Sequence, residues 1–229
     1  MRKIVFILSF LAVALSSSAD INEYTVEVGE FSKLKVINDI DVVYKCVPDS
    51  AGKAVFVAED SLADAYLFTN KNGTLKIEKY TDFATVEVPQ VTVYSNFLTS
   101  VENSSQKNVE VVSVASCPEF SVKQIGNGSV TVDNIEATKV NAKVATGKGR
   151  ITIQGECTRA SLSMVGTGTI QADSLEADEV SCSVFGTGSI GCWPVDKLSV
   201  KGLASTTVYY RGTPKTIKKT GFAKVEPLK

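Results

Sequence analysis

The chain has 229 residues, with 24 Lys and Arg against 25 Asp and Glu, and it contains no histidine. Charges of both signs are scattered, so there is no clustered basic face of the kind that binds nucleic acid. Without an imidazole, Ser-His-Asp and Cys-His catalysis are excluded, and any catalysis would have to use carboxylates, a lysine, a thiol or a bound metal.

The first 19 residues have the pattern of a secretory signal. Arg2 and Lys3 precede an apolar run over residues 4–15, and small residues lead to Ala19. This run is shorter than the about 20 apolar residues that span a bilayer. We expect cleavage after Ala19, which takes the formal charge from −1 to −3 because Arg2 and Lys3 leave. The remaining chain is expected to be exported, to the periplasm, the outer cell surface or the medium, and not to span a membrane.

Residues 20–118 are rich in predicted strands but have no fixed repeat. Phe31 to Val47 alternates apolar and polar residues, as a half-buried strand does. Ser61 to Phe68 predicts a short helix capped by Ser61, and Asn72-Gly73 predicts a tight hairpin turn. No segment has the length and composition of a linker, so we predict a single domain over residues 20–229.

A Gly-x-Gly turn recurs four times in the second half of that domain, residues 119–229. The turns begin at Gly126, Gly147, Gly166 and Gly186, at spacings of 21, 19 and 20 residues. A period near 20 without a helical pattern predicts a solenoid with one coil per repeat. A degenerate fifth coil follows from Val200 to Tyr210. The predicted fold class is therefore an all-β parallel solenoid with an irregular β-rich first half.

Each turn is followed by a strand that places apolar residues on one face. In stacked coils Val130, Ile151, Ile170 and Ile190 would form one inward column, and burial of each side chain contributes about 1.5–3 kcal/mol. The glycines would supply backbone room and a positive φ. A phosphate-binding glycine loop would instead occur once, ahead of a helix. We therefore interpret the glycines as corners of the coil.

Five cysteines are present, so in an exported chain at least one is free or pairs with another molecule. Cys182 and Cys192 fall on inward positions and are expected to be buried thiols. Cys46 and Cys117 could form a disulfide, which the sequence does not decide. Cys157 lies beside two non-basic residues, unlike a typical thiolate nucleophile.

Two further groups of residues each allow two interpretations. Trp193-Pro194 and Tyr209-Tyr210 could stack on sugars, or they could cap the β core. Glu176 and Asp178 could be the carboxylates of a glycosidase, which must converge in a cleft, or they could be solvated acids in a polar connection between coils. We therefore assign no catalytic, cofactor-binding or metal-ligating residue.

The order of several short motifs resembles one bacterial family. These are "FSKLKVINDIDVVYK" (Phe31 to Lys45), "NGTLKIEKY" (Asn72 to Tyr80), "VPQVTVYSN" (Val88 to Asn96), the serial "GTGTI" and "GTGSI" turns, and "VYYRGTPKTIKKTG" (Val208 to Gly221). Over roughly residues 29 to 226 the chain is similar to the putative auto-transporter adhesin head domain, or head GIN domain, common in Bacteroidetes. The resemblance implies a right-handed β-helix and export. It does not include a membrane barrel, so autotransport is not expected.

Modification at serine is a further expectation tied to that bacterial group. Three Asp-Ser-apolar triplets, centred on Ser50, Ser61 and Ser174, resemble the acceptor of periplasmic O-glycosylation in Bacteroidetes.

Two functions follow from these observations. The first is an exported, non-enzymatic protein for adhesion, surface binding or envelope scaffolding. The second is a carbohydrate-active β-helix enzyme, a lyase or hydrolase. The absence of histidine favours the first. Its partner would be an extracellular or envelope ligand, a glycan or a protein, with no cofactor and no nucleic acid. The sequence leaves open whether the chain forms homo-oligomers.

Overall fold

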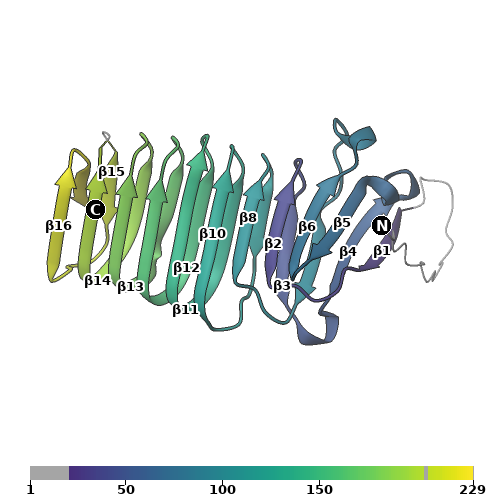
Figure 1. The fold of residues 1–229 in the computed structure, drawn as a ribbon, viewed down its shortest axis with the longest axis horizontal. Helices are drawn as coiled ribbons and strands as arrows, with labels where there is room; N and C mark the ends of the chain where they lie inside the picture. The colour runs from purple at the N-terminus through teal and green to yellow at the C-terminus, as the bar shows by residue number, and fades with distance from the viewer. Residues whose placement is uncertain (1–20, 204–205, 229) are drawn as a thin grey trace.

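The predicted fold class is confirmed. The structure, a computed structural model, describes residues 21–203 and 206–228, and it is 66% strand and 6% helix, wound as a β-solenoid of about 6 turns. The expected signal, residues 1–19, lies outside the described residues. The coils stack along one long axis, with the glycine turns along one edge and the opposite corners along the other (Figure 1).

Seventeen strands and three short 3-10 helices make up the described chain. The strands are β1 (Ile21–Glu27), β2 (Lys33–Ile37), β3 (Val42–Cys46), β4 (Lys53–Glu59), β5 (Tyr66–Lys71), β6 (Thr74–Lys79), β7 (Val91–Ser95), β8 (Ser100–Ser104), β9 (Asn108–Val111), β10 (Cys117–Ile125), β11 (Ser129–Thr146), β12 (Arg150–Met164), β13 (Thr169–Val184), β14 (Ser189–Gly202), β15 (Thr207–Tyr210), β16 (Thr216–Gly221) and β17 (Lys224–Pro227). The 3-10 helices are η1 (Pro48–Ser50), η2 (Asp60–Ala65) and η3 (Thr81–Phe83).

The long strands β11 to β14 bend at the corner opposite the glycine turns, and each contributes to two coils. The first half of β11 pairs in parallel with β9, and its second half pairs with β10. The bend interrupts the pairing with β12 between Val132 and Ile135. The predicted polar connections are therefore parts of continuous strands, and Ile135 and Leu175 within them are buried.

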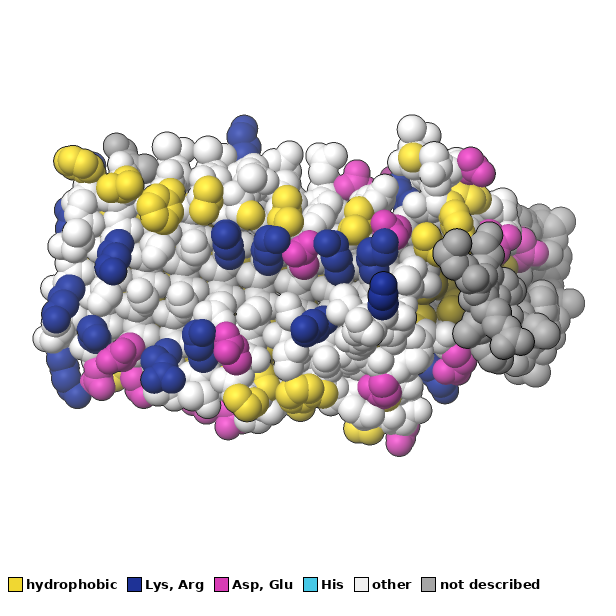
Figure 2. Space-filling view, in the orientation of Figure 1, with side chains coloured by type: hydrophobic (Ala, Val, Ile, Leu, Met, Phe, Trp, Pro, Cys, Tyr) yellow, Lys and Arg dark blue, Asp and Glu magenta, His cyan; other side chains and the backbone are white. Residues whose placement is uncertain are grey.

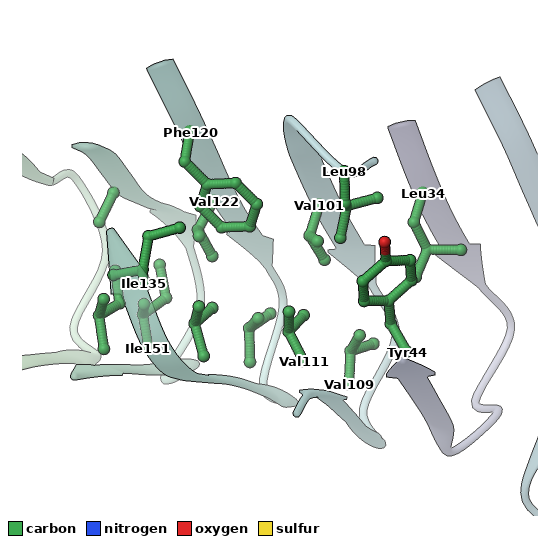
Figure 3. Close-up of a cluster of buried hydrophobic side chains, with 14 of the residues drawn as sticks. Leu34, Tyr44, Leu98, Val101, Val109, Val111, Phe120, Val122, Ile135 and Ile151 are labelled. Carbon is green, nitrogen blue, oxygen red and sulfur yellow. The ribbon is translucent and has the colours of Figure 1, made fainter. Parts of the chain in front are cut away.

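The predicted inward column is confirmed. Val130, Ile151, Ile170 and Ile190 are paired one after another in parallel register and are fully buried. Strand pairing spaces such residues about 4.8 Å apart. Side chains of the facing sheet, among them Val101 and Val122, meet this interior from the other side (Figure 3).

Parallel coils begin earlier than the glycine repeat predicts. β2 pairs in parallel with β6 on one side and β8 on the other, while β3 pairs with β7 and β9. The coil β2–β3 thus lies between coils that come later in the chain. Its turn has no Gly-x-Gly because Asn38 and Asp39 take the positive φ values of 66° and 54°, which Asn and Asp tolerate better than most residues.

The first end of the solenoid is closed by antiparallel strands. β4 pairs antiparallel with β1 and β7, and β5 pairs antiparallel with β6. The predicted hairpin is confirmed, with Lys71 opposite Thr74 and positive φ at Asn72 and Gly73. The predicted helix with a Ser61 cap is wrong in type and start. The segment η2 is a 3-10 helix that begins at Asp60, and its N-cap residue, Glu59, makes no side-chain capping hydrogen bond.

The expectation of positive φ at every glycine turn is wrong for two of the four turns. Gly126 and Gly147 have φ values of 92° and 76°, but Gly166, Gly168 and Gly186 do not have positive φ. Glycine is required at these turns because a side chain would collide with the backbone of the preceding coil. A Cβ on Gly166 would lie 2.6 Å from the carbonyl oxygen of Gly147, and on Gly168 or Gly186 it would overlap the backbone of the coil before.

The last coil ends the solenoid with open strand edges. β16 pairs with β14, and β17 pairs with β15. All six residues of β16 are exposed. Lys219 occupies the register position of the inward residue Val200. A charge at an inward position of an edge strand opposes further strand addition.

Candidate functional site

A groove follows the corner opposite the glycine turns. Glu136, Glu156 and Glu176 occupy successive rungs of one parallel ladder, which places them about 4.8 Å apart along the axis. Asp178 lies in the same groove. All four carboxylates are exposed. We call this feature the acidic groove.

The floor of the acidic groove is made of small buried side chains. Cys117, Ala137, Cys157 and Ala177 stack in register directly after the glutamates or their equivalents. Small residues at this position keep the floor low between two rows of larger polar side chains. The groove has a volume of about 530 Å³ and is lined by Ser116, Cys117, Pro118, Glu136, Ala137, Thr138, Glu156, Cys157, Thr158, Glu176 and Asp178.

Burial makes the groove thiols poor nucleophiles. Burial, followed by the nearby charge of Asp178, raises the pKa of Cys157 to about 11. Burial also raises the pKa of Cys117. A nucleophilic cysteine needs the opposite shift, towards the thiolate at neutral pH. The groove therefore offers carboxylates and hydroxyls to a ligand rather than a reactive sulfur.

A second, smaller hollow lies beside the acidic groove on the same strands. Its outward ladder runs Lys139, Arg159, Glu179 and Lys197 in register. Lys139 pairs with Glu119 at 3.0 Å, and Lys197 pairs with Glu179 at 3.7 Å. These exposed pairs contribute little stability. They do neutralise this flank, so negative charge is concentrated in the groove itself.

The structure places the aromatic candidates near the last coils. The guanidinium of Arg211 lies over the ring of Trp193, with its Cζ 4.2 Å from the ring centre, so one face of the indole is covered. Pro194 is buried. Tyr209 is 37% exposed, whereas Tyr210 is partly buried and packs against the core.

The five cysteines are free thiols. Cys182 and Cys192 are buried, as expected, and the structure does not join Cys46 to Cys117. Cys46 instead donates to the carbonyl oxygen of Asn96 at 3.3 Å.

The three candidate acceptor serines are on the surface to different degrees. Ser61 and Ser174 are exposed, whereas Ser50 is half-buried in η1.

Sequence reasoning named Glu176 and Asp178, and the structure brings them together. It missed Glu136 and Glu156, which share their groove. The 20-residue spacing of the glutamates and of the small residues after them was the available signal. Among residues 21–203 and 206–228, no group of Cys, Asp or Glu has an arrangement that could hold a metal ion. None of the helices within these ranges is long and apolar enough to cross a bilayer.

Solved structures share this fold. A putative adhesin from Bacteroides fragilis is 18% identical, with a TM-score of 0.79 over 92% of this chain and 98% of that one. A putative adhesin from Parabacteroides distasonis is 21% identical, with a TM-score of 0.71 over 92% and 98%. A putative lipid binding protein from the same species is 17% identical, with a TM-score of 0.66 over 91% and 97%. No curated protein matches the sequence.

The strand pairing and the solved structures of the same fold define the class of this protein as an all-β parallel solenoid, or β-helix. Residues 30–214 match the family described as "Putative auto-transporter adhesin, head GIN domain". The chain belongs to this family, and the resemblance seen in its motifs is confirmed.

Proposed function

We propose that the protein is an exported, non-enzymatic binding protein of the cell surface or envelope, and that the acidic groove holds its ligand. The observation that carries this proposal is the repeated rung of Glu136, Glu156 and Glu176 above a floor of small residues. Such a row suits an extended ligand, a glycan or a peptide, that meets the same group at each step. The family and the signal pattern support adhesion and export.

The negative charge of the groove also determines which ligands it favours. Four exposed carboxylates repel a polyanion and attract amino groups, while the hydroxyls of Thr138 and Thr158 can bond to neutral sugars. Ligands with neutral or cationic repeating units are therefore favoured over uronic acid polymers.

Repetition also argues for binding over catalysis. General acid–base chemistry needs two groups in different environments, whereas the three glutamates occupy equivalent rungs. The thiols beneath them have raised pKa values. One observation favours the alternative of a carbohydrate-active enzyme, namely that Glu176 and Asp178 line one groove.

A binding screen tests the proposal. The chain is isolated from envelope fractions, where we expect it to begin at Asp20, and is applied to neutral, amino and acidic glycans and to extended peptides. Glu156→Gln should weaken binding of the preferred ligand about tenfold, because a hydrogen bond to a charged group contributes roughly 1.5–3 kcal/mol. The matched control is Glu110→Gln, at an exposed glutamate of β9, which should bind like the wild type.

Three results would contradict this function. One is a preference for acidic glycans, and another is equal loss of binding in the Glu110→Gln control. The third is turnover: if polysaccharides incubated with the protein, with and without calcium, yield new reducing ends that Glu176→Gln abolishes, the chain is an enzyme.

A further inference from the structure

Large apolar side chains are exposed in a row along the edge that carries the glycine turns. Val165, Phe185, Leu203 and Phe222 are 43%, 56%, 72% and 78% exposed. Each residue after the first donates its backbone N–H to the coil before it, at Met164, Val184 and Gly202 respectively. The four residues therefore occupy the same position in successive coils, and we call them the apolar row.

The fold does not require this row. The position lies next to the turn and faces outward, and the equivalent residue of an earlier coil is Ala145. Hydrophobic side chains follow one another along the upper margin of the molecule (Figure 2). Single exposed apolar residues are ordinary, but a contiguous line of them marks a surface that meets another apolar phase.

Charge is segregated between the two edges of the regular coils. From residue 119 to residue 225, every Asp and Glu is at least five residues from the nearest glycine of a Gly-x-Gly turn. At about 3.3 Å per strand residue, that is about 16 Å along the strand. The acids gather instead around the opposite corner, where the acidic groove lies.

The turn edge carries cations in their place. Lys143, Lys148, Arg150, Lys201 and Lys224 are exposed, and among the described residues none of them forms an ion pair. Residues 197–229 contain eight Lys and Arg against one Glu. The most exposed members of the apolar row, Leu203 and Phe222, thus lie in the most basic part of the chain.

We propose that the turn edge of the last coils docks on an anionic lipid surface. Phe185, Leu203 and Phe222 enter the interface between headgroups and acyl chains, and the flanking cations contact the headgroups. Apolar insertion and a basic patch together give stable peripheral binding where either alone is marginal. The acidic groove would then face away from the bilayer, since negative charge is repelled by the same surface.

Two other occupants fit the edge less well. A second copy of the chain, paired through the same edge, would bring Lys201 and Lys224 against their own equivalents. A soluble polyanion would neutralise the cations but would leave Phe185 and Phe222 in water. The proposal does not rest on the proposed function, because the groove lies at the opposite corner.

Vesicle flotation tests the proposal with the chain from Asp20 onward, which contains every strand of the solenoid. The vesicles are phosphatidylcholine alone or mixed with phosphatidylglycerol. Binding to the mixed vesicles should be tighter, and it should fall in about 1 M salt, where the Debye length shrinks to about 3 Å. The double variant Phe185→Ser, Phe222→Ser should bind at least about tenfold more weakly, following the free energy of burying a Phe side chain.

The charge variant is Lys201→Gln with Lys224→Gln, and it should lose about fivefold in affinity per lysine. Phe97→Ser, at a phenylalanine that is 38% exposed in the first half, and the pair Lys45→Gln with Lys71→Gln are the matched controls and should bind like the wild type. Unchanged melting of all variants shows that folding is intact.

The proposal is wrong if the phenylalanine variant binds vesicles like the wild type, or if the controls lose as much. It is also wrong if neutral and anionic vesicles bind equally. A fourth outcome would also contradict the proposal and would show that the apolar row binds a second copy of the chain. In that case light scattering finds a dimer for the wild type and a monomer for the phenylalanine variant, and neither protein binds vesicles.

Discussion

At the scale of single residues, glycines that look alike in the sequence have different functions. Gly126 has a φ of 92°, and the nearest atom to an added Cβ would be the carbonyl oxygen of Ser105 at 3.7 Å. Gly168 has no positive φ, but an added Cβ would overlap the carbonyl oxygen of Gly149. The first glycine provides a backbone conformation, and the second provides space for the neighbouring coil.

Asparagine distinguishes these two requirements, because it tolerates positive φ but has a Cβ. Gly126→Asn should lower the free energy of unfolding by less than about 1 kcal/mol, as the native Asn38 turn indicates. Gly168→Asn should lower it by about 1–3 kcal/mol or more, because the coils must separate. Urea denaturation measures both. If the two variants lost the same free energy of unfolding, the close approach of the neighbouring coil would not be the reason for glycine at position 168.

At the scale of the coil, the inward column holds each turn of the solenoid to the next. Ile170 is fully buried between Ile151 and Ile190. Ile170→Ala should lower the free energy of unfolding by about 2–5 kcal/mol, since the rigid neighbours cannot fill the cavity. Val225 occupies the same column in the last coil but is only partly buried.

Val225→Ala is therefore the control, with an expected loss below about 1.5 kcal/mol. Denaturant unfolding of the two variants gives the comparison. If Val225→Ala cost as much as Ile170→Ala, the last coil would be covered by something else in solution.

The sequence predicted those coils that the glycines mark, because a repeated close approach of backbones requires the same residue each time. It did not predict the coils around β2–β3 and β8–β9, because Asn38 and Asp39 make one turn without glycine and the coils do not follow chain order. Glu176 and Asp178 were recognised as a pair. The groove was not, since it depends on the register between strands 20 residues apart.

At the scale of the whole molecule, the buried side chains of Tyr44, Tyr66 and Cys157 make stability depend on pH in the alkaline range, because each is neutral when protonated and charged when ionised. Burial raises the pKa of Tyr44 to about 12 and that of Tyr66 further, and Cys157 is raised to about 11. In the unfolded chain these groups ionise near their ordinary values of 9 to 10. Above about pH 9 the unfolded state therefore binds fewer protons than the folded state, and stability falls as pH rises.

The expected result is that these groups contribute their full stability below about pH 9, and that it is lost as pH rises through about 11 to 12. Denaturant titrations at a series of alkaline pH values measure this loss. Cys157→Ala should flatten the earlier part of the curve, because the Cys157 thiol has the lowest of these raised pKa values. A curve that does not respond to Cys157→Ala would show that its thiol is solvated.

The parallel register gives the protein an adjustable length. Each regular coil of β11 to β14 pairs with the coil before it and the coil after it in the chain, so a duplicated segment of about 20 residues can be inserted there without redesigning the rest. Every such insertion would lengthen the molecule by about 4.8 Å. It would also add one glutamate to the acidic groove and one side chain to the apolar row, because both features recur once per coil. Reach and the number of contacts would therefore increase together, in equal steps.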